Sequence, residues 1–313
     1  MIPYIDLHCD TLTEVSKMNR EFSLEEQPTL QVDLRRLREA DVMAQFFAVW
    51  MSDVELEWSD WTHIERLVSI LQGSLSEDFR LALSVEEIEK HAEEGVLSAI
   101  LSLEDCRVVE SIDDLEKLYT MGFRSYGLIW NYANSLGFPN SRDRDVMQRG
   151  LTKLGKEAVE WLNASGALVD VSHLSDGGFW DIAQMTKKPF VATHSNARAL
   201  TDHPRNLTDE MIRAIAQSGG VAGINFCPAF LSEKSERNFL EDHVAHLNHM
   251  KNVGGEDFVA IGSDFDGVSG ELAIDSPLAM QKLFDALEKE GWSERQIQKL
   301  ARDNVLRVLR EVW

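Results

Sequence analysis

The chain has 313 residues, of which 53 are acidic and 31 are basic, so its formal net charge is −22 at pH 7. Its hydrophobic content of 44% is enough to bury a sizeable core and is too high for a disordered chain. The acidic excess argues against nucleic acid and anionic membranes as partners, because both attract basic surfaces. At this length the chain can form two domains or one large α/β barrel.

The cysteines and the N-terminal segment bear on the compartment. Cys9, Cys106 and Cys227 are odd in number and contain no CxxC pair, so they do not indicate a disulfide framework. The segment MIPYIDLHCD lacks the basic and apolar regions of a signal peptide. No apolar run approaches the roughly 20 residues that a membrane helix needs. These features predict a soluble, cytoplasmic protein.

Short apolar runs rich in β-forming residues alternate with longer amphipathic segments. We expect eight strands, over residues 4–10, 42–50, 98–105, 123–131, 167–173, 189–195, 220–227 and 258–266. Apolar residues spaced three or four apart predict helices between them, for example over residues 151–165, 209–218 and 241–253. In the second of these, Thr208 is the expected N-cap, and Gly219 and Gly220 are the expected end.

Eight successive strand–helix units are typical of a closed (β/α)8 barrel, which we expect to form a single domain over residues 1–313. The alternative is an open doubly wound sheet, but no GxGxxG motif follows the first predicted strand. Two segments are expected to leave the barrel: the acidic, tryptophan-rich residues 52–59 and the turn-rich residues 137–149.

Polar side chains interrupt the ends of five predicted strands. These residues are His8 and Asp10, Glu104, His173, His194, and Asp264 with Asp266. In a barrel the carboxyl ends of the strands meet at one rim, where active sites are built. A lone histidine or aspartate at such a place is usually a hydrogen-bonded or turn-forming residue. Their coincidence on five strands instead favours one or two transition-metal ions such as zinc, with Glu104 able to bridge two of them.

At this point the sequence resembles a known family. The segments IDLHCDTL, LSLEDC, VDVSHLSD, THSNARALTDHPRNLTDE and AIGSDFDG look like motifs of the membrane (renal) dipeptidase family, peptidase family M19, in the amidohydrolase superfamily. The resemblance runs in order from residue 4 to the segment DNVLRVL near the C-terminus. It implies a (β/α)8 barrel with a binuclear zinc site, which agrees with the independent strand count.

The resemblance also implies a role for each residue. His8 and Asp10 would hold one zinc ion, and His173 and His194 would hold the other. Glu104 would bridge the two ions together with a water or hydroxide whose pKa they lower towards 7. Asp264 would be the acid/base residue that passes a proton to the leaving amine, so that Asp264 and Glu104 form the catalytic pair. Arg205 would bind the substrate carboxylate through its planar guanidinium.

One position departs from the family pattern. Many members have a histidine in a motif that reads approximately LTHN, whereas the matching stretch here is GLIWN, so Trp130 takes the place of that histidine. Trp130 and Asn131 are therefore expected to line the substrate pocket. Either the indole N–H or the amide of Asn131 or Asn134 could donate a hydrogen bond there, and apolar lining is the alternative role for Trp130.

Several other conspicuous residues have structural explanations. His243, His246 and His249 recur every third residue in a helical segment, which favours structural hydrogen bonds over metal binding. Trp58 and Trp61 are expected in a solvated cap beside the pocket. Cys9 should point away from its neighbouring ligands by strand alternation. Asp266 precedes a glycine and is expected to support Asp264 from a turn.

The predicted function is that of a cytosolic zinc dipeptidase that cleaves free dipeptides and tolerates a D-residue at the C-terminal position. A homodimer is implied by the resemblance alone. Two alternatives remain open. One is a metal-dependent amidase or lactonase that acts on N-acyl amino acids or cyclic amides. The other is a barrel that binds a ligand without catalysis.

Overall fold

The strands follow most of the predicted apolar runs, and helices connect them. The computed structural model describes residues 2–18, 23–51, 59–232 and 236–313. Its strands are β1 (Tyr4–Cys9), β2 (Val42–Trp50), β3 (Phe79–Leu81), β4 (Leu97–Glu104), β5 (Phe123–Gly127), β6 (Leu168–Asp170), β7 (Ala222–Ile224) and β8 (Val259–Ile261). Each pairing between these strands is parallel.

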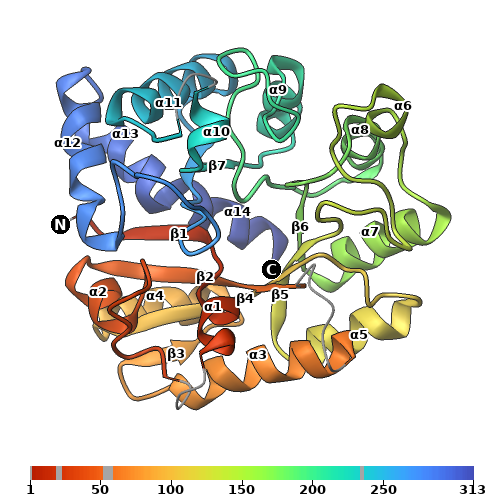
Figure 1. Cartoon of the computed structure of the whole chain (residues 1–313), viewed down its shortest axis with the longest axis horizontal. Coiled ribbons are helices and arrows are strands. Elements are labelled where there is room, and N and C mark those ends of the chain that lie inside the picture. The colour runs from red at the N-terminus through yellow and green to blue at the C-terminus, as the bar shows by residue number, and fades with distance from the viewer. Residues whose placement is uncertain (1, 19–22, 52–58, 233–235) are drawn as a thin grey trace.

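Most of the helices surround the strands, as Figure 1 shows. In chain order they are α1 (Thr11–Lys17), α2 (Leu34–Glu39), α3 (Asp60–Ser74), α4 (Val85–Glu93), α5 (Ile112–Thr120), α6 (Arg144–Met147), α7 (Lys153–Ser165), α8 (Asp176–Met185), α9 (Asp209–Gln217), α10 (Pro228–Leu231), α11 (Leu240–Gly254), α12 (Gln281–Lys289), α13 (Glu294–Gln298) and α14 (Asn304–Val312). A 3₁₀ turn (Pro277–Ala279) precedes α12, and a π-helical segment (Lys299–Asp303) joins α13 to α14. Among the described residues, no helix has both the length and the apolar character needed to cross a membrane.

The strands form a ring that is open between β6 and β7, and residues 189–195, the sixth predicted strand, bridge this gap. The hydrogen-bonded order is β6-β5-β4-β2-β1-β8-β7. Residues 189–195 are not a regular strand, but Val191 bridges to Asp170 of β6 and Ala192 bridges to Ala222 of β7. This segment, which we call the sixth stave, thus lies between the two ends of the sheet. The predicted (β/α)8 barrel is confirmed.

The strand prediction needs two corrections. The strand β3 is not among the eight predicted runs; it pairs with the first residues of β4, and β5 pairs with β4 from Leu101 onwards. A strand of three residues is too short for its alternation to stand out in a sequence. The second correction is that β5 ends at Gly127, and that β6, β7 and β8 have only three residues each. The remaining residues of these runs leave the sheet and carry the polar side chains of the rim.

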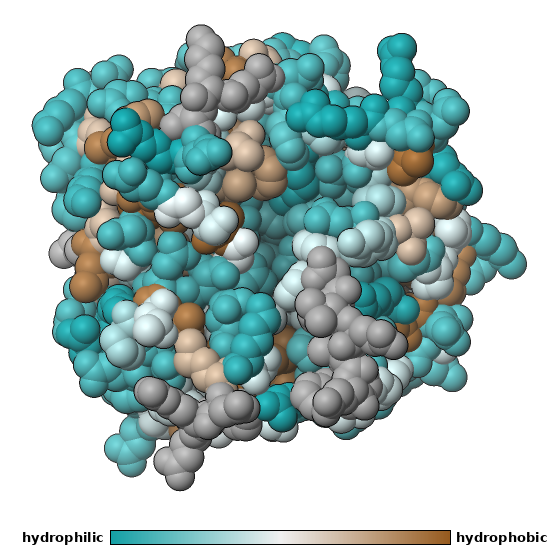
Figure 2. Space-filling view, in the orientation of Figure 1, coloured by the Kyte–Doolittle hydropathy of each residue, from teal (hydrophilic) through white to brown (hydrophobic). Residues whose placement is uncertain are grey.

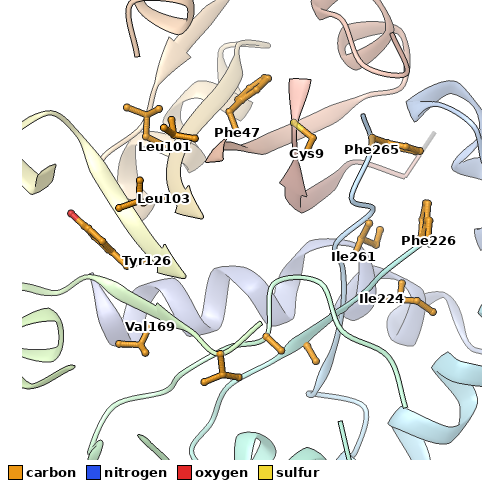
Figure 3. Close-up of a cluster of buried hydrophobic side chains, with 14 of the residues drawn as sticks. Cys9, Phe47, Leu101, Leu103, Tyr126, Val169, Ile224, Phe226, Ile261 and Phe265 are labelled. Carbon is orange, nitrogen blue, oxygen red and sulfur yellow. The ribbon is translucent and has the colours of Figure 1, made fainter. Parts of the chain in front are cut away.

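Apolar side chains fill the space between the ring and the helices. Figure 3 shows part of this layer: the labelled side chains come from strands around the ring and from the segments just after β7 and β8, and they point away from the centre of the ring. Cys9 belongs to this layer and is fully buried, as alternation along β1 predicts. A second cluster joins Phe46 and Ile100 to Val305 and Leu309 of α14. The barrel is therefore a packed core rather than an open pore.

Local capping agrees with the sequence at α9, where the Thr208 side chain accepts a hydrogen bond from the Met211 N–H as predicted. Of the expected excursions, residues 137–149 contain the short helix α6. Trp58 and residues 52–57 lie outside the described residues. The cap prediction is wrong for Trp61, because its half-buried ring packs against the main core from α3.

Candidate metal centre

Glu104 lies between two groups of potential metal ligands. At the end of β4, its Oε2 atom lies 3.4 Å from His8 Nε2. Its Oε1 atom lies 3.1 Å from His173 Nε2 and 3.7 Å from His194 Nε2. On the first side, Asp10 Oδ2 lies 3.5 Å from His8 Nε2. Each group keeps its ligand atoms within 4.8 Å of one another, and Glu104 belongs to both.

The backbone adopts irregular conformations where it presents these side chains. His173 and Asp264 have φ angles of 67° and 63°, in the left-handed region that residues with a side chain rarely enter. Strain of this kind costs about 1–3 kcal/mol and persists where the surrounding structure enforces it, often at functional sites. The pairing of β1 with β2 also shifts register between Asp6 and Cys9, next to His8. Asp10 lies beyond the strand, immediately before α1.

Hydrogen bonds at Nδ1 orient His173 and His194. The Nδ1 atom of His173 lies 3.1 Å from Asn131 Oδ1, an acceptor. The Nδ1 atom of His194 lies 2.7 Å from Thr193 Oγ1, whose own proton is donated to Asp170 Oδ2. Both rings therefore carry their proton on Nδ1, and both Nε2 atoms are left with a lone pair.

The two lone pairs face each other, because His173 Nε2 and His194 Nε2 are only 3.1 Å apart. Neither atom can donate to the other when the protons are on Nδ1, so a cation is needed to make this contact favourable. On the other side of Glu104, both ring nitrogens of His8 and the Oδ1 atom of Asp10 are buried without a hydrogen-bond partner. Imidazole nitrogens and carboxylate oxygens suit zinc and similar divalent ions. The described residues therefore fit metal ions on both sides of Glu104.

Burial and neighbouring charges shift the titration of the site. Burial, together with the Glu104 carboxylate, raises the pKa of Asp10 to about 6. Burial also raises the pKa of Asp264 to about 7, with help from the Asp10 and Glu104 carboxylates. For Glu104, burial is outweighed by the charge and hydrogen bonding of His8, which hold its pKa below the usual range. Burial and the Arg205 cation lower the pKa of His173 to about 4, so its ring is neutral near pH 7.

Asp264 is held between His8 and a residue that the sequence analysis missed. Its Oδ1 atom lies 3.8 Å from His8 Nε2, and its Oδ2 atom accepts a hydrogen bond of 2.8 Å from Asn225 Nδ2. Asn225 is fully buried just after β7 and also exchanges backbone–side-chain hydrogen bonds with Asn196. Its position at a strand end in the segment GINFC was the available signal.

Asp266 lies outside the metal groups and fixes the backbone. Its carboxylate accepts hydrogen bonds from the Gln31 N–H, the Val32 N–H and the Thr11 hydroxyl. It therefore fastens the segment after β8 to the loop that precedes α2, which fits the predicted supporting role. The next residue, Gly267, lies so close to the site that a Cβ atom there would be 2.0 Å from Asp10 Oδ2.

A cavity of about 670 Å³ opens beside the metal groups. In the space-filling view the molecule is hollowed near the middle of the face turned to the viewer (Figure 2). The lining of the cavity includes side chains of three kinds: the metal-type residues Asp10, Glu104, His173 and Asp264, the aromatic residues Trp50, Trp130 and Phe230, and the charged residues Glu14, Lys17 and Arg205.

Arg205 is a buried cation at this cavity. Its guanidinium donates to Ser195 Oγ at 3.2 Å and to the His194 carbonyl at 3.1 Å, and its Nε atom is buried without a partner. No carboxylate of the described residues lies within 4.0 Å of it, although the chain has 22 more acidic than basic residues. A buried arginine without an anion is unusual and is suited to bind an anionic ligand.

Trp130, Asn131 and Asn134, which follow β5, have different roles in the structure. Trp130 lines the cavity and has its ring centroid 6.0 Å from that of His173. Asn131 also lines the cavity, and its Oδ1 atom orients His173. The amide of Asn134 is used within its own loop, since it donates to Asp105 and Leu128 and accepts from the Leu136 N–H.

The histidines of α11 form structural hydrogen bonds. His243 contacts the Phe239 carbonyl, His246 contacts the Leu231 carbonyl and the Ala197 N–H, and His249 contacts Asp209. They belong to none of the potential metal groups found among the described residues. This arrangement agrees with their predicted structural role.

Comparisons with known proteins extend over the whole chain. The family model described as membrane dipeptidase (peptidase family M19) matches residues 1–313. A Klebsiella pneumoniae protein named "Uncharacterized protein in pqqA 5'region" is 37% identical over 270 residues, which cover 83% of this chain and 97% of its own. The dipeptidase tcpJ of Claviceps purpurea is 26% identical over 294 residues, which cover 90% of this chain and 69% of its own.

Solved structures agree in fold and extent. The dipeptidase AC, a metallopeptidase of family M19, superposes with a TM-score of 0.91 at 28% identity, over 100% of this chain and 99% of its own. A metallopeptidase from Rhodobacter sphaeroides, bound to a phosphinate mimic of the dipeptide L-Ala-D-Ala, superposes with a TM-score of 0.90 at 28% identity and the same coverage. The chain therefore belongs to the membrane dipeptidase family, peptidase family M19.

Proposed function

We propose that the protein is a binuclear zinc dipeptidase that hydrolyses the single amide bond of free dipeptides. In this proposal His8 and Asp10 hold one ion, His173 and His194 hold the other, and Glu104 bridges them. The observation that carries it is the position of Glu104, which turns one oxygen towards each group of ligands. When bound, two zinc ions would acidify a water molecule and polarise the scissile carbonyl.

Asp264 is the proposed acid/base residue. Its carboxylate lines the cavity next to the proposed ligands, where a group that carries protons to and from the substrate must lie. Asn225 occupies the Oδ2 atom, so Oδ1, on the His8 side, is the oxygen left to take a proton and pass it to the leaving amine. Glu104 has a lowered pKa and stays ionised, which suits a ligand rather than a proton carrier. The two carboxylates thus have different roles because their surroundings differ.

Arg205 is proposed to bind the α-carboxylate of the substrate. Its planar guanidinium matches a carboxylate, and its burial would make that charge pair strong. Recognition of the carboxylate restricts the enzyme to peptides with a free C-terminus one residue beyond the scissile bond. We propose that a D-residue is accepted there. This is supported by the dipeptide mimic in the Rhodobacter sphaeroides relative, whose C-terminal residue corresponds to D-alanine.

We also propose that the protein acts in the cytoplasm as a homodimer. The location is supported by its three free cysteines, the state that a reducing compartment maintains. The dimer rests on the family resemblance. Measurement of the molecular mass in solution by light scattering would test it.

Two experiments test the activity. The first measures zinc per chain by elemental analysis: native protein should bind two ions, and Glu104→Gln should bind markedly less because both sites lose a charge. The second compares a free-acid dipeptide with its C-terminal amide, using native enzyme and Arg205→Ala. Native enzyme should prefer the free acid by about 10²-fold or more in kcat/KM, and the variant should not. Turnover of N-acetyl amino acids in preference to dipeptides would favour the amidase alternative. Two bound ions without any hydrolysis would favour a binding protein.

A further inference from the structure

An aromatic wall lines the cavity at the ends of β2 and β5. We define the aromatic wall as Trp50 and Trp130, which line the cavity, together with Tyr132, which packs against Trp130 without lining the cavity itself. The ring centroids of Trp50 and Trp130 lie 5.0 Å apart with an interplanar angle of 68°, and those of Trp130 and Tyr132 lie 5.8 Å apart. The Trp50–Trp130 pair packs edge to face, an arrangement that is favourable between aromatic rings. The wall is therefore one packed unit rather than three separate side chains.

Strand register places this wall beside the metal centre. Trp50 ends β2 in register with Glu104 of β4, so the two side chains extend to the same side of the sheet. Trp130 follows β5, which borders β4 on its other edge, and the Trp130 ring lies close to His173. The two indoles thus come from the strands on either side of Glu104. At the same level β5 carries Gly127, which leaves the space above it without a side chain.

Arg205 approaches the cavity from the other side of the barrel. In ring order the staves are β1, β2, β4, β5, β6, the sixth stave, β7 and β8, so β4 stands opposite β7. Arg205 follows the sixth stave, and Phe230 follows β7. If Arg205 binds the substrate carboxylate, which is part of the proposed function, the N-terminal residue of the dipeptide extends across the metal centre towards the aromatic wall.

The cavity has room for a side chain at the wall. Its volume of about 670 Å³ remains although Trp50 and Trp130 line it, and it lies within the range of sites that hold ligands larger than two small residues. Both indoles are half-buried, so part of each ring stays uncovered. A ligand that covers this apolar surface lowers the free energy of the complex. Lys17 Nζ lies 5.7 Å from the Trp50 ring centroid, which disfavours a second cation at that end.

We propose that the aromatic wall is the binding site for the N-terminal side chain of the substrate and that it selects large apolar and aromatic residues. Trp130 is the central specificity-determining residue, because its ring contacts both of the others. Charged and very small N-terminal residues would leave the indole faces uncovered. The C-terminal side chain lies on the Arg205 side and is not selected by this wall.

Hydrolysis of two matched substrate series tests the proposal with the zinc-loaded enzyme. In the first series the N-terminal residue is Phe, Leu, Ala or Lys and the C-terminal residue is alanine, supplied in both configurations. In the second series the N-terminal residue is alanine and the C-terminal residue varies. Native enzyme should favour Phe and Leu over Ala by at least about tenfold in kcat/KM in the first series, the range expected for added apolar groups in a matching pocket. The second series should show a smaller spread.

Two variants assign the preference to the wall. Trp130→Ala should lose most of the preference for Phe, so that its kcat/KM falls further for Phe-first than for Ala-first substrates. Trp161→Ala is the matched control: this half-buried indole packs against Tyr119 on the outer helices and does not line the cavity. It should retain the native preference. An equal loss for Phe-first and Ala-first substrates in Trp130→Ala would overturn the proposal, since it would indicate a general catalytic or structural role.

A binding measurement separates this proposal from the proposed function. Phosphinate mimics of Phe-Ala and Ala-Ala are titrated calorimetrically into native enzyme and Trp130→Ala. If native enzyme binds the Phe-Ala mimic more tightly than the Ala-Ala mimic and Trp130→Ala does not, the result supports the wall. This holds even if no dipeptide is hydrolysed, an outcome that would contradict only the proposed function. Rapid hydrolysis with equal affinity for the two mimics would overturn the wall and leave the dipeptidase proposal intact.

Discussion

Replacing Gly267 by alanine would insert a methyl group between two carboxylates of the site. A Cβ atom at this position would lie 2.0 Å from Asp10 Oδ2 and 2.6 Å from Asp264 Oδ1. Gly267 is not among the residues with positive φ, so alanine can adopt its backbone conformation. The effect of the substitution should therefore be steric and local.

The size of the effect follows from these distances. Ordinary van der Waals contacts of a Cβ atom begin at 3.4 Å, so the Asp10 carboxylate must move by more than about 1 Å. Metal–ligand distances tolerate only about 0.2 Å, so Asp10 would no longer hold its ion. Misplacement by about 1 Å can cost on the order of 10²-fold in rate, or about 2.7 kcal/mol. The aspartate side chain can rotate away, and the fold should therefore survive.

Metal content, kcat/KM and thermal unfolding would be measured for Gly267→Ala beside Gly73→Ala. Gly73 lies in α3, and a Cβ there would meet nothing within 4 Å. The Gly73 variant should keep two ions and native activity, and it should gain up to about 1 kcal/mol in stability because alanine favours the helix. The Gly267 variant should bind less metal and lose activity, while its melting temperature without metal stays near that of the metal-free native protein. Two tightly bound ions and full activity in Gly267→Ala would refute this account of the site.

Three further predictions concern single residues. Asp264→Asn should keep both ions and lower kcat by about 10²–10⁴-fold, the range for positioned proton transfer, and unchanged steady-state turnover would move the acid/base role elsewhere. Asn225→Asp should retain its metal content and lower kcat at least about tenfold, because a second carboxylate would face Asp264 Oδ2. A kcat equal to that of the native enzyme at every pH would contradict this. Burial lowers the pKa of His246 to about 4, below the value of about 6.5 in the unfolded chain, so the unfolded state binds the proton first. The free energy of unfolding should therefore fall between pH 6.5 and 4, by up to about 3 kcal/mol relative to His246→Gln, and parallel urea-denaturation profiles of the two proteins would contradict this.

Much of the fold was predictable from local pattern. Alternation and apolar runs located β1, β2 and β4 closely, and the helical spacing located α7, α9 and α11. These elements are long enough for their period to stand out from the surrounding sequence. The sixth stave and β3 are short, and they belong to the sheet only because neighbouring strands supply hydrogen-bond partners. Pairing of that kind depends on residues far away in the chain and leaves no local period.

The clustering of the metal-type side chains was predictable for a similar reason. Metal-type side chains at the ends of apolar runs must converge once parallel strands close into a barrel, so His8, Glu104 and His194 could be placed without coordinates. Asp10 lies past the end of β1, beyond a register shift, so its position also depends on how the chain folds after the strand. Asn225 was missed because amides at strand ends are common, and only its distance to Asp264 distinguishes it.

The sequence by itself determined the barrel, the family and the set of metal-type residues, because these depend on periodicity and on motifs that are contiguous in the chain. The tertiary structure decided how these residues are oriented: which oxygen of Glu104 faces which histidines, which partner leaves each Nε2 atom with a lone pair, and which side of the cavity carries Trp130. Orientation is decided by contacts between strands far apart in sequence and by backbone angles such as those of His173 and Asp264. No local pattern of residues encodes these orientations, because each one depends on contacts with distant residues that form only when the barrel closes.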